Sequence, residues 1–345
     1  MTNLNSILSD INKLSNHDKE IIIDAIEEIL VFGSYALDVE SDIKEHRFSK
    51  GRVCPHCGGH DICRYGKSQG KQRYLCHSCK RTFADFTSSP AYNSKKPLKK
   101  WLLYAKCMVN GYSVRKSAEI VGIHPSTSFY WRHKILDAIR MFLGVGHVEG
   151  IVEADETFFR ESFKGNHSKN SNFKMPRESH KRGTPASKRG ISNEQVCVAT
   201  AVDRQGDIIA ELICRGRITH NDLKRLYAER IGDNSILCTD SHKSYIRFAD
   251  NLHLEHHRIK PGRFKEGIYH IQHVNSMHSE LKQWIRRFKG VSTKYLANYI
   301  YWFKWLQLFK YERDIIKAKD LLLHSSTVHT TTTVADFKDR KAIFI

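Results

Sequence analysis

The first residues of the chain carry an apolar stripe with the spacing of a helix. Its members, all on one helical face, are Leu4, Ile7, Leu8, Ile11 and Leu14. A second short amphipathic helix is expected to start after Ser15 or Asn16, because Asp18 and Glu20 suit the positive end of a helix dipole. The chain is therefore expected to open with a small helical segment.

Strand and helix patterns alternate from residue 148 onward. Strand candidates lie at 151–155, 195–203, 207–215 and 235–240, and helical periodicity appears at 220–231, 242–250 and 273–289. Adjacent strands followed by helix, strand and helix predict a mixed α/β sheet. An aromatic helix is expected from about Ser292 to Tyr311, and the threonine-rich stretch 325–335 predicts a loose tail.

Charge is spread unevenly over the sequence. The chain has 56 Lys and Arg against 37 Asp and Glu, which gives a net charge of +19. Residues 1–45 carry −7, so the rest of the chain carries +26. This excess predicts a polyanionic partner, because each Lys or Arg on a phosphate releases counterions. The acidic segment either caps the body of the protein or pairs with another copy.

Several protein classes are excluded. No run of about 18 apolar residues is present, so no membrane partner is expected. The polar segment after Met1 has the features of neither a signal peptide nor a transit peptide. Nine cysteines, an odd number in so long a chain, argue against a secreted disulfide scaffold. We therefore expect a multidomain protein of a reducing compartment.

Four of the cysteines have the spacing of a metal site. Cys54 and Cys57 form one Cys-x2-Cys pair, and Cys76 and Cys79 form a second, with 18 residues between the pairs. Each pair can lie on a tight knuckle that aims two thiolates at one tetrahedral ion, and Gly58–Gly59 supply the backbone freedom. The spacing predicts one structural Zn²⁺ in a basic zinc ribbon. Unrelated cysteines or a redox pair are the alternatives.

Residues 112–135 have the pattern of a helix-turn-helix. Apolar positions of helical period reach Val121, Gly122 follows at the turn, and a Ser/Thr-rich stretch leads into a second helix at Ser128. On that helix, Arg132 and Lys134 are placed for phosphates or base edges. An ordinary helical hairpin is the alternative, but the positive charge of the chain favours DNA binding.

Two aspartates end strand candidates. Asp155 ends the first strand and Asp240 ends the fourth. Strand alternation puts Glu153 and Asp155 on one face and Glu156 on the other. Two carboxylates at neighbouring strand ends suit hard divalent cations, although a single Asp at a strand end is usually a helix cap or turn former.

The helix at 273–289 offers a third ligand on either side of its apolar stripe. At about 100° per residue, Asn275 and Lys282 share one edge of the helix, whereas Glu280 lies about 140° from Asn275. Glu is the stronger Mg²⁺ ligand by charge, but it cannot share that edge with Lys282. We therefore expect Asn275, and not Glu280, to complete the site.

These motifs together resemble bacterial insertion-sequence transposases of the ISXO-like group. The segments that carry the resemblance are CPHCGG (54–59), CHSCKRTF (76–83), EADETFF (153–159), TDSHKSY (239–245) and HVNSMHSELKQWIRRFKGVSTKYLANYIYWFKW (273–305). The last is the most specific, because Asn275 and Lys282 have the spacing of the D-D-N-K pattern. The resemblance covers about residues 50–310.

The resemblance implies a multidomain α/β protein with an RNase H-like, mixed-sheet catalytic domain. The expected parts are an acidic helical segment (1–48), a zinc ribbon (49–90), a helix-turn-helix DNA-binding domain (95–145), the catalytic domain with C-terminal helices (148–315) and a C-terminal tail (316–345).

The resemblance also implies a Mg²⁺- or Mn²⁺-dependent DNA transposase of the bacterial cytoplasm, associated with the nucleoid. Asp155, Asp240 and Asn275 would hold two ions for strand cleavage and strand transfer, and Lys282 would hold a phosphate. The partners would be double-stranded DNA, as terminal inverted repeats and target, and a second copy in a homodimer or higher oligomer.

Basic side chains beyond the helix-turn-helix are expected along the DNA backbone. The insert 160–190 carries +7 and includes Lys181, Arg182, Lys188 and Arg189, while Arg286 and Arg287 follow the catalytic helix. We expect the insert to be flexible when free and ordered on DNA; a solvated loop is the alternative.

Two other functions stay open at this point. A DNA-binding regulator would keep the ribbon and helix-turn-helix with an inactive core. An RNase H-like nuclease or Holliday junction resolvase would need neither motif. The two aspartates favour an enzyme over a regulator, and the two DNA-binding motifs favour a transposase over a free-standing nuclease.

Overall fold

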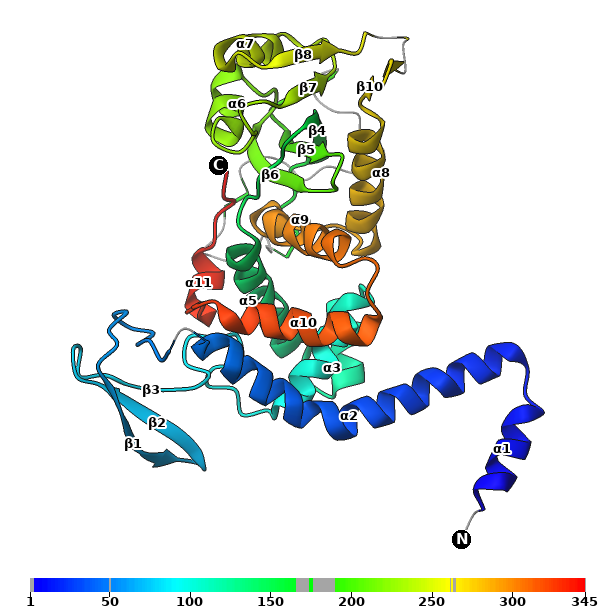
Figure 1. The fold of residues 1–345 in the computed structure, drawn as a ribbon, viewed down its shortest axis with the longest axis vertical. Coiled ribbons are helices and arrows are strands. Elements are labelled where there is room, and N and C mark those ends of the chain that lie inside the picture. The colour runs from blue at the N-terminus through cyan, green and yellow to red at the C-terminus, as the bar shows by residue number, and fades with distance from the viewer. Residues whose placement is uncertain are drawn as a thin grey trace. The chain divides into compact units, whose positions relative to one another are not determined.

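The structure is a computed structural model that describes residues 3–49, 51–165, 174–175, 190–260, 262 and 265–344, with the backbone alone at 24, 25 and 27–38. The chain forms two compact units (Figure 1). The first comprises Met1–Ser128 and Glu312–Thr331, and the second comprises Phe129–Tyr311 and Thr332–Ile345. The predicted helix-turn-helix domain is therefore divided between the two units, because its second helix crosses the boundary.

Two helices begin the first unit, α1 (Leu4–Asn12) and α2 (Asn16–Phe48). The predicted start of the second is confirmed: Ser15 is the N-cap, and its hydroxyl accepts the N–H of Asp18 at 3.1 Å. The predicted length is wrong, because α2 runs for 33 residues. No proline interrupts it, and its one glycine, Gly33, costs only about 1 kcal/mol.

The cysteine-rich segment folds as a three-stranded antiparallel sheet in the order β1 (Ile62–Ser68), β2 (Lys71–Cys76), β3 (Thr82–Ala84). The turn between β1 and β2 places Gln69 and Gly70 at φ 49° and 75°. Positive φ at both central residues is what a tight hairpin turn requires. Tyr74 and Phe83, with ring centroids 5.5 Å apart, form its small core beside the cysteines.

The other helices of the first unit are α3 (Leu98–Val109), α4 (Val114–Val121), the start of α5 (Pro125–Leu143) and α10 (Asp314–Thr327). Gly122 ends α4 in the left-handed region at φ 66°, as the turn requires. The second helix of the predicted motif begins at Pro125, three residues before the expected Ser128, because proline is well suited to a first helical position. α10 packs against α2 and α3.

The second unit contains a five-stranded mixed sheet in the order β6-β5-β4-β7-β8. Its strands are β4 (Ile151–Arg160), β5 (Gln195–Asp203), β6 (Ile208–Arg215), β7 (Ile236–Thr239) and β8 (Glu255–Arg258). β4 pairs antiparallel with β5 and parallel with β7. The predicted mixed sheet is confirmed. The sequence missed β8, whose residues EHHR show no apolar alternation. A two-stranded ribbon, β9 (Lys265–Glu266) and β10 (Tyr269–His270), precedes the next helix.

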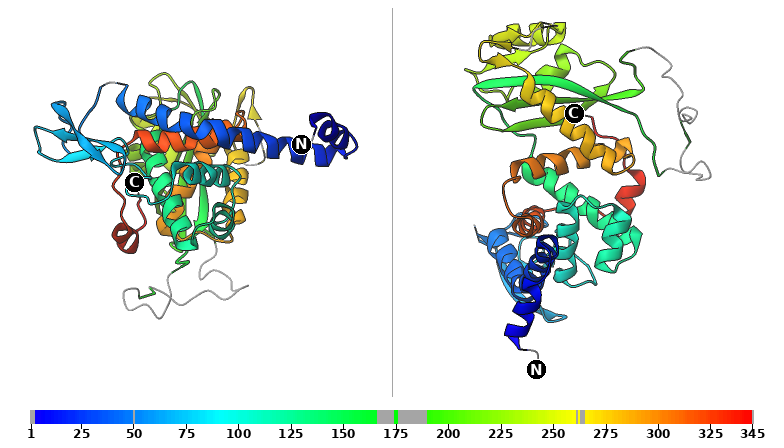
Figure 2. Two further views of the ribbon diagram at one scale, coloured as in Figure 1. Left: turned by 90° about the horizontal axis from the view of Figure 1, so that it is seen from below. Right: turned by 90° about the vertical axis from the view of Figure 1, so that its right-hand side faces the viewer.

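Helices cover both faces of this sheet. α6 (His220–Tyr227) and α7 (Lys243–Leu252) pack on one face through an apolar core that includes Ala154, Leu223 and Phe248. The other face carries α8 (Gln272–Arg287), which contacts β4 and β5 and crosses the sheet in the right-hand view of Figure 2. Successive residues of β4 therefore alternate between an apolar core and α8.

The aromatic helix is α9 (Thr293–Leu308), and it contacts β6. Its aromatic side chains are mostly core: Trp302 is fully buried, and its ring lies 4.9 Å from that of Trp284 on α8. None of the helices in the part of the chain that the structure describes is both long and apolar enough to cross a bilayer.

The expected loose tail is wrong in two places. α10 extends to Thr327, and its Leu321 and Leu322 are fully buried in the first unit. α11 (Val334–Asp339) follows in the second unit, where Phe337 is buried and stacks on Tyr130 at 5.4 Å. The low complexity of residues 325–335 favoured a loose tail, which is wrong. Apolar residues on either side of this stretch are buried against distant parts of the chain.

Candidate functional site

Asp155 lies within β4, and Asp240 directly follows β7, the parallel neighbour of β4. The last registered pair between β4 and β7 is Glu153 opposite Cys238. Each aspartate lies two residues beyond this pair, and the charge of Asp240 acts on the carboxyl group of Asp155. The prediction that the first strand ends at Asp155 is wrong, because β4 continues to Arg160 in its pairing with β5. The two carboxylates are nevertheless near enough for the charge of one to act on the other.

The electrostatics of Asp155 agree with this placement. Its carboxyl group is largely buried, with 20% of the side chain exposed. Burial is the main cause that raises the pKa of Asp155 to about 6, and the nearby charge of Asp240 adds to the rise. The N–H of Glu156 and the ammonium of Lys282 act in the opposite direction. Asp240 and Lys282 are thus both close enough to act on one carboxylate.

Glu153 fastens α8 to the sheet. Its carboxylate is 1% exposed and accepts the backbone N–H groups of His273 at 2.8 Å and Val274 at 3.2 Å. Arg204 Nη1 lies 2.9 Å from the same carboxylate. A negative charge at a helix N-terminus is stabilising, so the carboxylate acts as a buried cap. His270 joins the cluster at 3.2 Å, and the guanidinium takes the place that a metal ion would need between these groups.

Asn275 and Glu280 lie on different sides of α8. Glu280 Oε2 accepts the side-chain N–H of Gln307 on α9 at 2.7 Å, so its carboxylate is turned toward α9. Asn275 is exposed, one residue after the cap made by Glu153. Lys282 lies seven residues further on, and its charge acts on Asp155. The predicted separation of the two edges of this helix agrees with these contacts.

His278 is a site residue that the sequence interpretation missed. It is 6% exposed, and its Nε2 lies 2.6 Å from Thr200 Oγ1 on β5. Its Nδ1 lies 3.7 Å from Asp155 Oδ2. Burial, followed by the charge of Lys282, lowers the pKa of His278 to about 4, so the ring is neutral at pH 7. The available signal was spacing: His278 lies three residues after Asn275 and four before Lys282, on the same helical face.

Glu156 points to the opposite face of β4, as strand alternation predicts. Burial raises the pKa of Glu156 to about 8, and the charge of Asp155 contributes next. Beyond it, Tyr245 on α7 is fully buried. Glu156 is therefore mostly protonated at pH 7 and belongs to the core between the sheet and α7, away from the aspartate pair.

This raised pKa predicts how stability depends on pH. Because the folded-state pKa of Glu156 exceeds its unfolded value, its contribution is fully present below about pH 4.3 and is lost as the pH rises through about 8. We expect Glu156→Gln to raise the melting temperature in EDTA at pH 9 and to change it little at pH 4. The exposed Glu229→Gln is the control. Equal melting temperatures of wild type and Glu156→Gln at pH 9 would contradict the prediction.

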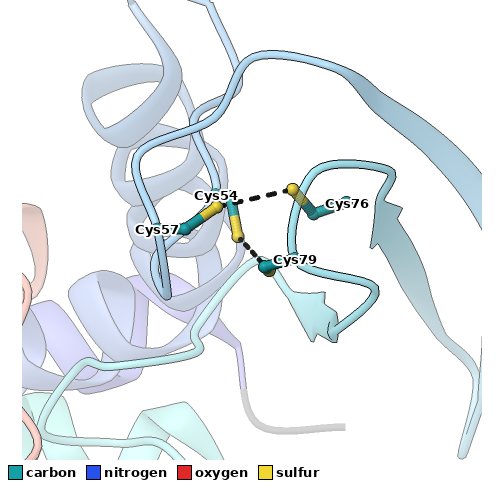
Figure 3. Close-up of side chains that lie close together, drawn as sticks. All are labelled: Cys54, Cys57, Cys76 and Cys79. Atoms are coloured by element: carbon teal, nitrogen blue, oxygen red, sulfur yellow. Dashed lines mark hydrogen bonds between the residues drawn. The ribbon is translucent and has the colours of Figure 1, made fainter.

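The four spaced cysteines come together in the first unit (Figure 3). Their sulfur atoms all lie within 4.8 Å of one another, with Cys54 Sγ to Cys79 Sγ at 3.6 Å and Cys57 Sγ to Cys76 Sγ at 3.7 Å. Sulfurs of a tetrahedral zinc site, each about 2.3 Å from the ion, are separated by distances of this order. The cluster is compatible with one structural Zn²⁺.

The two knuckles of this cluster have the same backbone geometry. In the first, the N–H of Gly58 donates to Cys54 O at 2.9 Å; in the second, the N–H of Lys80 donates to Cys76 O at 2.9 Å. Gly58 has φ 74° and Lys80 has φ 58°, so both knuckles use the left-handed region. Gly58 supplies the backbone freedom predicted for the first knuckle, whereas the second knuckle adopts the same conformation with a lysine.

The basic residues predicted to contact DNA differ in how exposed their side chains are. Arg132 was expected on the DNA, but its side chain is fully buried, with the guanidinium 5.0 Å from the ring centroid of Trp302. Helical periodicity alone could not reveal this, because α9 supplies the aromatic ring from a distant part of the chain. Lys134 is half-buried, and burial lowers its pKa. Arg286 and Arg287 are exposed in the last turn of α8.

The remaining basic residues of that prediction, Lys181, Arg182, Lys188 and Arg189, lie outside the described residues. In the helix-turn-helix, the second helix is exposed near its C-terminus, at Met141 and Phe142, and in its first turn, at Pro125 and Ser126. Two hydrogen bonds hold the first turn of this helix in place. Ser128 Oγ donates to Val114 O on α4 at 2.8 Å, and the hydroxyl of Tyr104 on α3 forms a hydrogen bond with Ser128 Oγ at 2.9 Å.

The second unit contains a segment that is similar to a known transposase domain. Residues 147–306 match the ISXO2-like transposase domain. A protein described as uncharacterized, in transposable element ISH50 of Halobacterium salinarum, is 26% identical over 275 residues, which is 79% of this chain and 88% of that protein. A pre-cleavage Mos1 transpososome shares 10% identity over 66% of this chain and 78% of its own, with a TM-score of 0.19.

The matched range contains both aspartates and the whole of α8. The resemblance seen in the sequence depended on the spacing of residues in these elements. The family match and the ISH50 relative confirm it. Residues 147–306 are therefore similar to the transposase domain of the ISXO-like group of insertion sequences.

Proposed function

We propose that this protein binds the terminal inverted repeats of an insertion sequence, nicks the DNA there and joins the ends to target DNA. The observation that supports the proposal is that the charges of Asp240 and Lys282 both act on the carboxyl group of Asp155. The chemistry belongs to an RNase H-like core in this proposal, and the DNA-binding motifs bring the substrate to it.

The residues at this site fit divalent cations. Two carboxylates that lie close together, one of them with a raised pKa, repel each other until a cation neutralises them. We assign Asp155 to both ions of a pair, Asp240 to one and Asn275 to the other. Bound Mg²⁺ or Mn²⁺ would polarise the scissile phosphate and lower the pKa of a water.

The chain's own residues position the substrate around that centre. Lys282, whose charge already acts on Asp155, holds a non-bridging phosphate oxygen and offsets the charge that develops there. Glu153 keeps α8 in register with β4, so that Asn275 and Lys282 stay near the aspartates. Cleavage and joining need the same site, because they differ only in whether water or a DNA 3′-OH attacks.

DNA is held by surfaces on both units in this proposal. Zn²⁺ on the four cysteines keeps the basic ribbon folded, and the exposed first turn of α5 at Ser126 reads base edges. Arg286 and Arg287 contact the backbone beside the site. We include the basic insert 160–190 among these contacts because of its charge, and a homodimer or higher oligomer because two ends must meet.

A cleavage assay tests the proposal. The full chain is incubated with a duplex that contains the inverted repeat flanking its gene, with Mg²⁺ or with EDTA. We expect nicks at the repeat boundary with Mg²⁺ and none with EDTA, followed by joined products when a target plasmid is added. Binding of the repeat without any nicking would instead favour a DNA-binding regulator, and nicking unrelated to the repeat would favour a nuclease.

Asn275, the proposed third ligand, is expected to matter more for nicking than Glu280 does. We expect Asn275→Ala to slow nicking by about a hundredfold, since an interaction with the reacting centre is worth roughly 2–3 kcal/mol. Glu280→Ala, which removes the contact to Gln307, should change the rate by less than about threefold. Single-turnover rates with saturating Mg²⁺ measure both. A larger effect of Glu280→Ala than of Asn275→Ala would overturn the assignment.

A further inference from the structure

We propose that His278 is an additional ligand of the divalent cation at Asp155, binding through Nδ1, so that the centre includes one nitrogen ligand among its oxygens. This inference rests on the proposed function, which places the cation at Asp155. Nδ1 of the imidazole has an available lone pair, lies near the carboxylate of Asp155 and is shielded from solvent together with it.

Thr200 determines which nitrogen of His278 carries the proton. The hydroxyl of Thr200 has a single hydrogen, and it donates that hydrogen to the backbone oxygen of Asp155 at 2.8 Å. Its oxygen must then accept from His278 Nε2, which lies 2.6 Å away. In a neutral imidazole the other nitrogen is unprotonated. Nδ1 therefore presents a lone pair.

That lone pair faces a second acceptor. Nδ1 lies 3.7 Å from Asp155 Oδ2, which is too long for a hydrogen bond, and neither atom of this pair has a proton to give when the carboxylate is ionised. Two ligand atoms that each lie about 2.1 Å from one ion can be up to about 4.2 Å apart. Adjacent ligands of an octahedral ion lie about 3.0 Å apart, so a side-chain shift of less than about 1 Å brings these two atoms onto one cation.

The imidazole is poorly placed for any role in solvent. It is 6% exposed, and its ring is held between β5 and α8 by the bond to Thr200. Lys282 is the charged group on its own helix whose charge acts on it, after the larger effect of burial. On the sheet it faces Asp155 of β4. A ligating histidine commonly has its other ring N–H bonded to an oxygen, as Nε2 does here.

The alternative is a histidine that only positions Asp155 through Thr200. The chain contains a comparison: His256 Nε2 lies 2.8 Å from Thr239 Oγ1, which donates to the backbone oxygen of Asp240 at 2.7 Å. His256 therefore contacts Thr239 on β7 in the same way that His278 contacts Thr200 on β5. If positioning were the whole role, the two histidines would behave alike toward a bound metal.

Mn²⁺ bound to the full chain tests the inference by pulsed electron paramagnetic resonance, which detects ¹⁴N coupled to the ion. We expect an imidazole ¹⁴N coupling in wild type and in His256→Gln, and its loss in His278→Gln. Labelling wild type with ¹⁵N-histidine should replace the ¹⁴N signal, which identifies histidine without any substitution. By calorimetry, His278→Gln should weaken Mn²⁺ binding by about tenfold and Mg²⁺ binding less, because imidazole is a better ligand for transition metals than for Mg²⁺.

The outcomes separate this inference from the proposed function. Mn²⁺ that binds wild type but not Asp155→Asn, and shows no ¹⁴N coupling, overturns the role of His278 and leaves the aspartate site standing. A coupling that persists in His278→Gln overturns it as well, since another histidine then supplies the nitrogen. Failure of wild type to bind Mn²⁺ overturns both.

Discussion

Replacing Asp155 or Asp240 by Asn is expected to abolish Mg²⁺-dependent nicking while leaving binding to the inverted repeat intact. Each substitution keeps the shape of the side chain and removes the negative charge that holds a cation. Metal-ion catalysis supplies several kcal/mol, so the loss of about 4 kcal/mol slows nicking by about 10³-fold or more. Single-turnover cleavage of the repeat duplex measures the rate, and a gel-shift titration measures binding.

Asp250→Asn is the matched control for this pair. Asp250 is exposed on α7, so its loss should leave the rate of nicking unchanged. A cleavage rate within tenfold of wild type in either Asp155→Asn or Asp240→Asn would contradict the assignment of these carboxylates to the catalytic centre. Loss of DNA binding in both would show that they act on the fold or on the DNA contacts instead.

The second large effect is expected at the cysteine cluster. Cys76→Ser should release Zn²⁺, unfold the ribbon and weaken binding to the repeat, because the apparent binding free energy of structural zinc is roughly 10–16 kcal/mol in zinc-finger peptides. The sheet β1–β3 has a core of few residues besides the cysteines, so little else holds it together. Metal analysis gives the zinc content, and limited proteolysis within residues 51–86 reports the unfolding.

Cys63→Ser controls for the loss of a thiol. Cys63 lies on β1, outside the four clustered sulfurs, and its replacement should leave one zinc per chain. A Cys76→Ser protein that keeps a full zinc and a protease-resistant ribbon would contradict the zinc-site interpretation. Because the second unit has its own sheet and core, its melting transition should be unchanged in either variant.

Local patterns predicted the parts of the candidate site that a few neighbouring residues control. Alternation along β4 separated Glu153 and Asp155 from Glu156, and helical spacing along α8 separated Asn275 from Glu280. The contacts of Glu153 with α8 and of Glu280 with Gln307 agree with both predictions. Such patterns depend on backbone geometry, which repeats every two or every 3.6 residues whatever lies opposite.

Contacts between distant segments decided the rest. Arg132 had the position of a DNA-reading residue, but α9 covers it with Trp302. His278 was not among the predicted site residues, because only the folded sheet brings Thr200 and Asp155 beside it. The stretch 325–335 lacked a strong pattern of its own, yet flanking apolar residues order it partly as helix.

By itself, then, the sequence determined the cysteine knuckles, the strand that bears Asp155, the face of α8 that bears Asn275 and Lys282, and the resemblance to a transposase domain. Only the tertiary structure decided which basic residues remain exposed, which histidine meets the aspartate and how far the terminal helices extend. The physical reason is that knuckles, strands and helix faces arise from residues close in sequence, whereas burial and electrostatic surroundings are set by side chains that arrive from far along the chain.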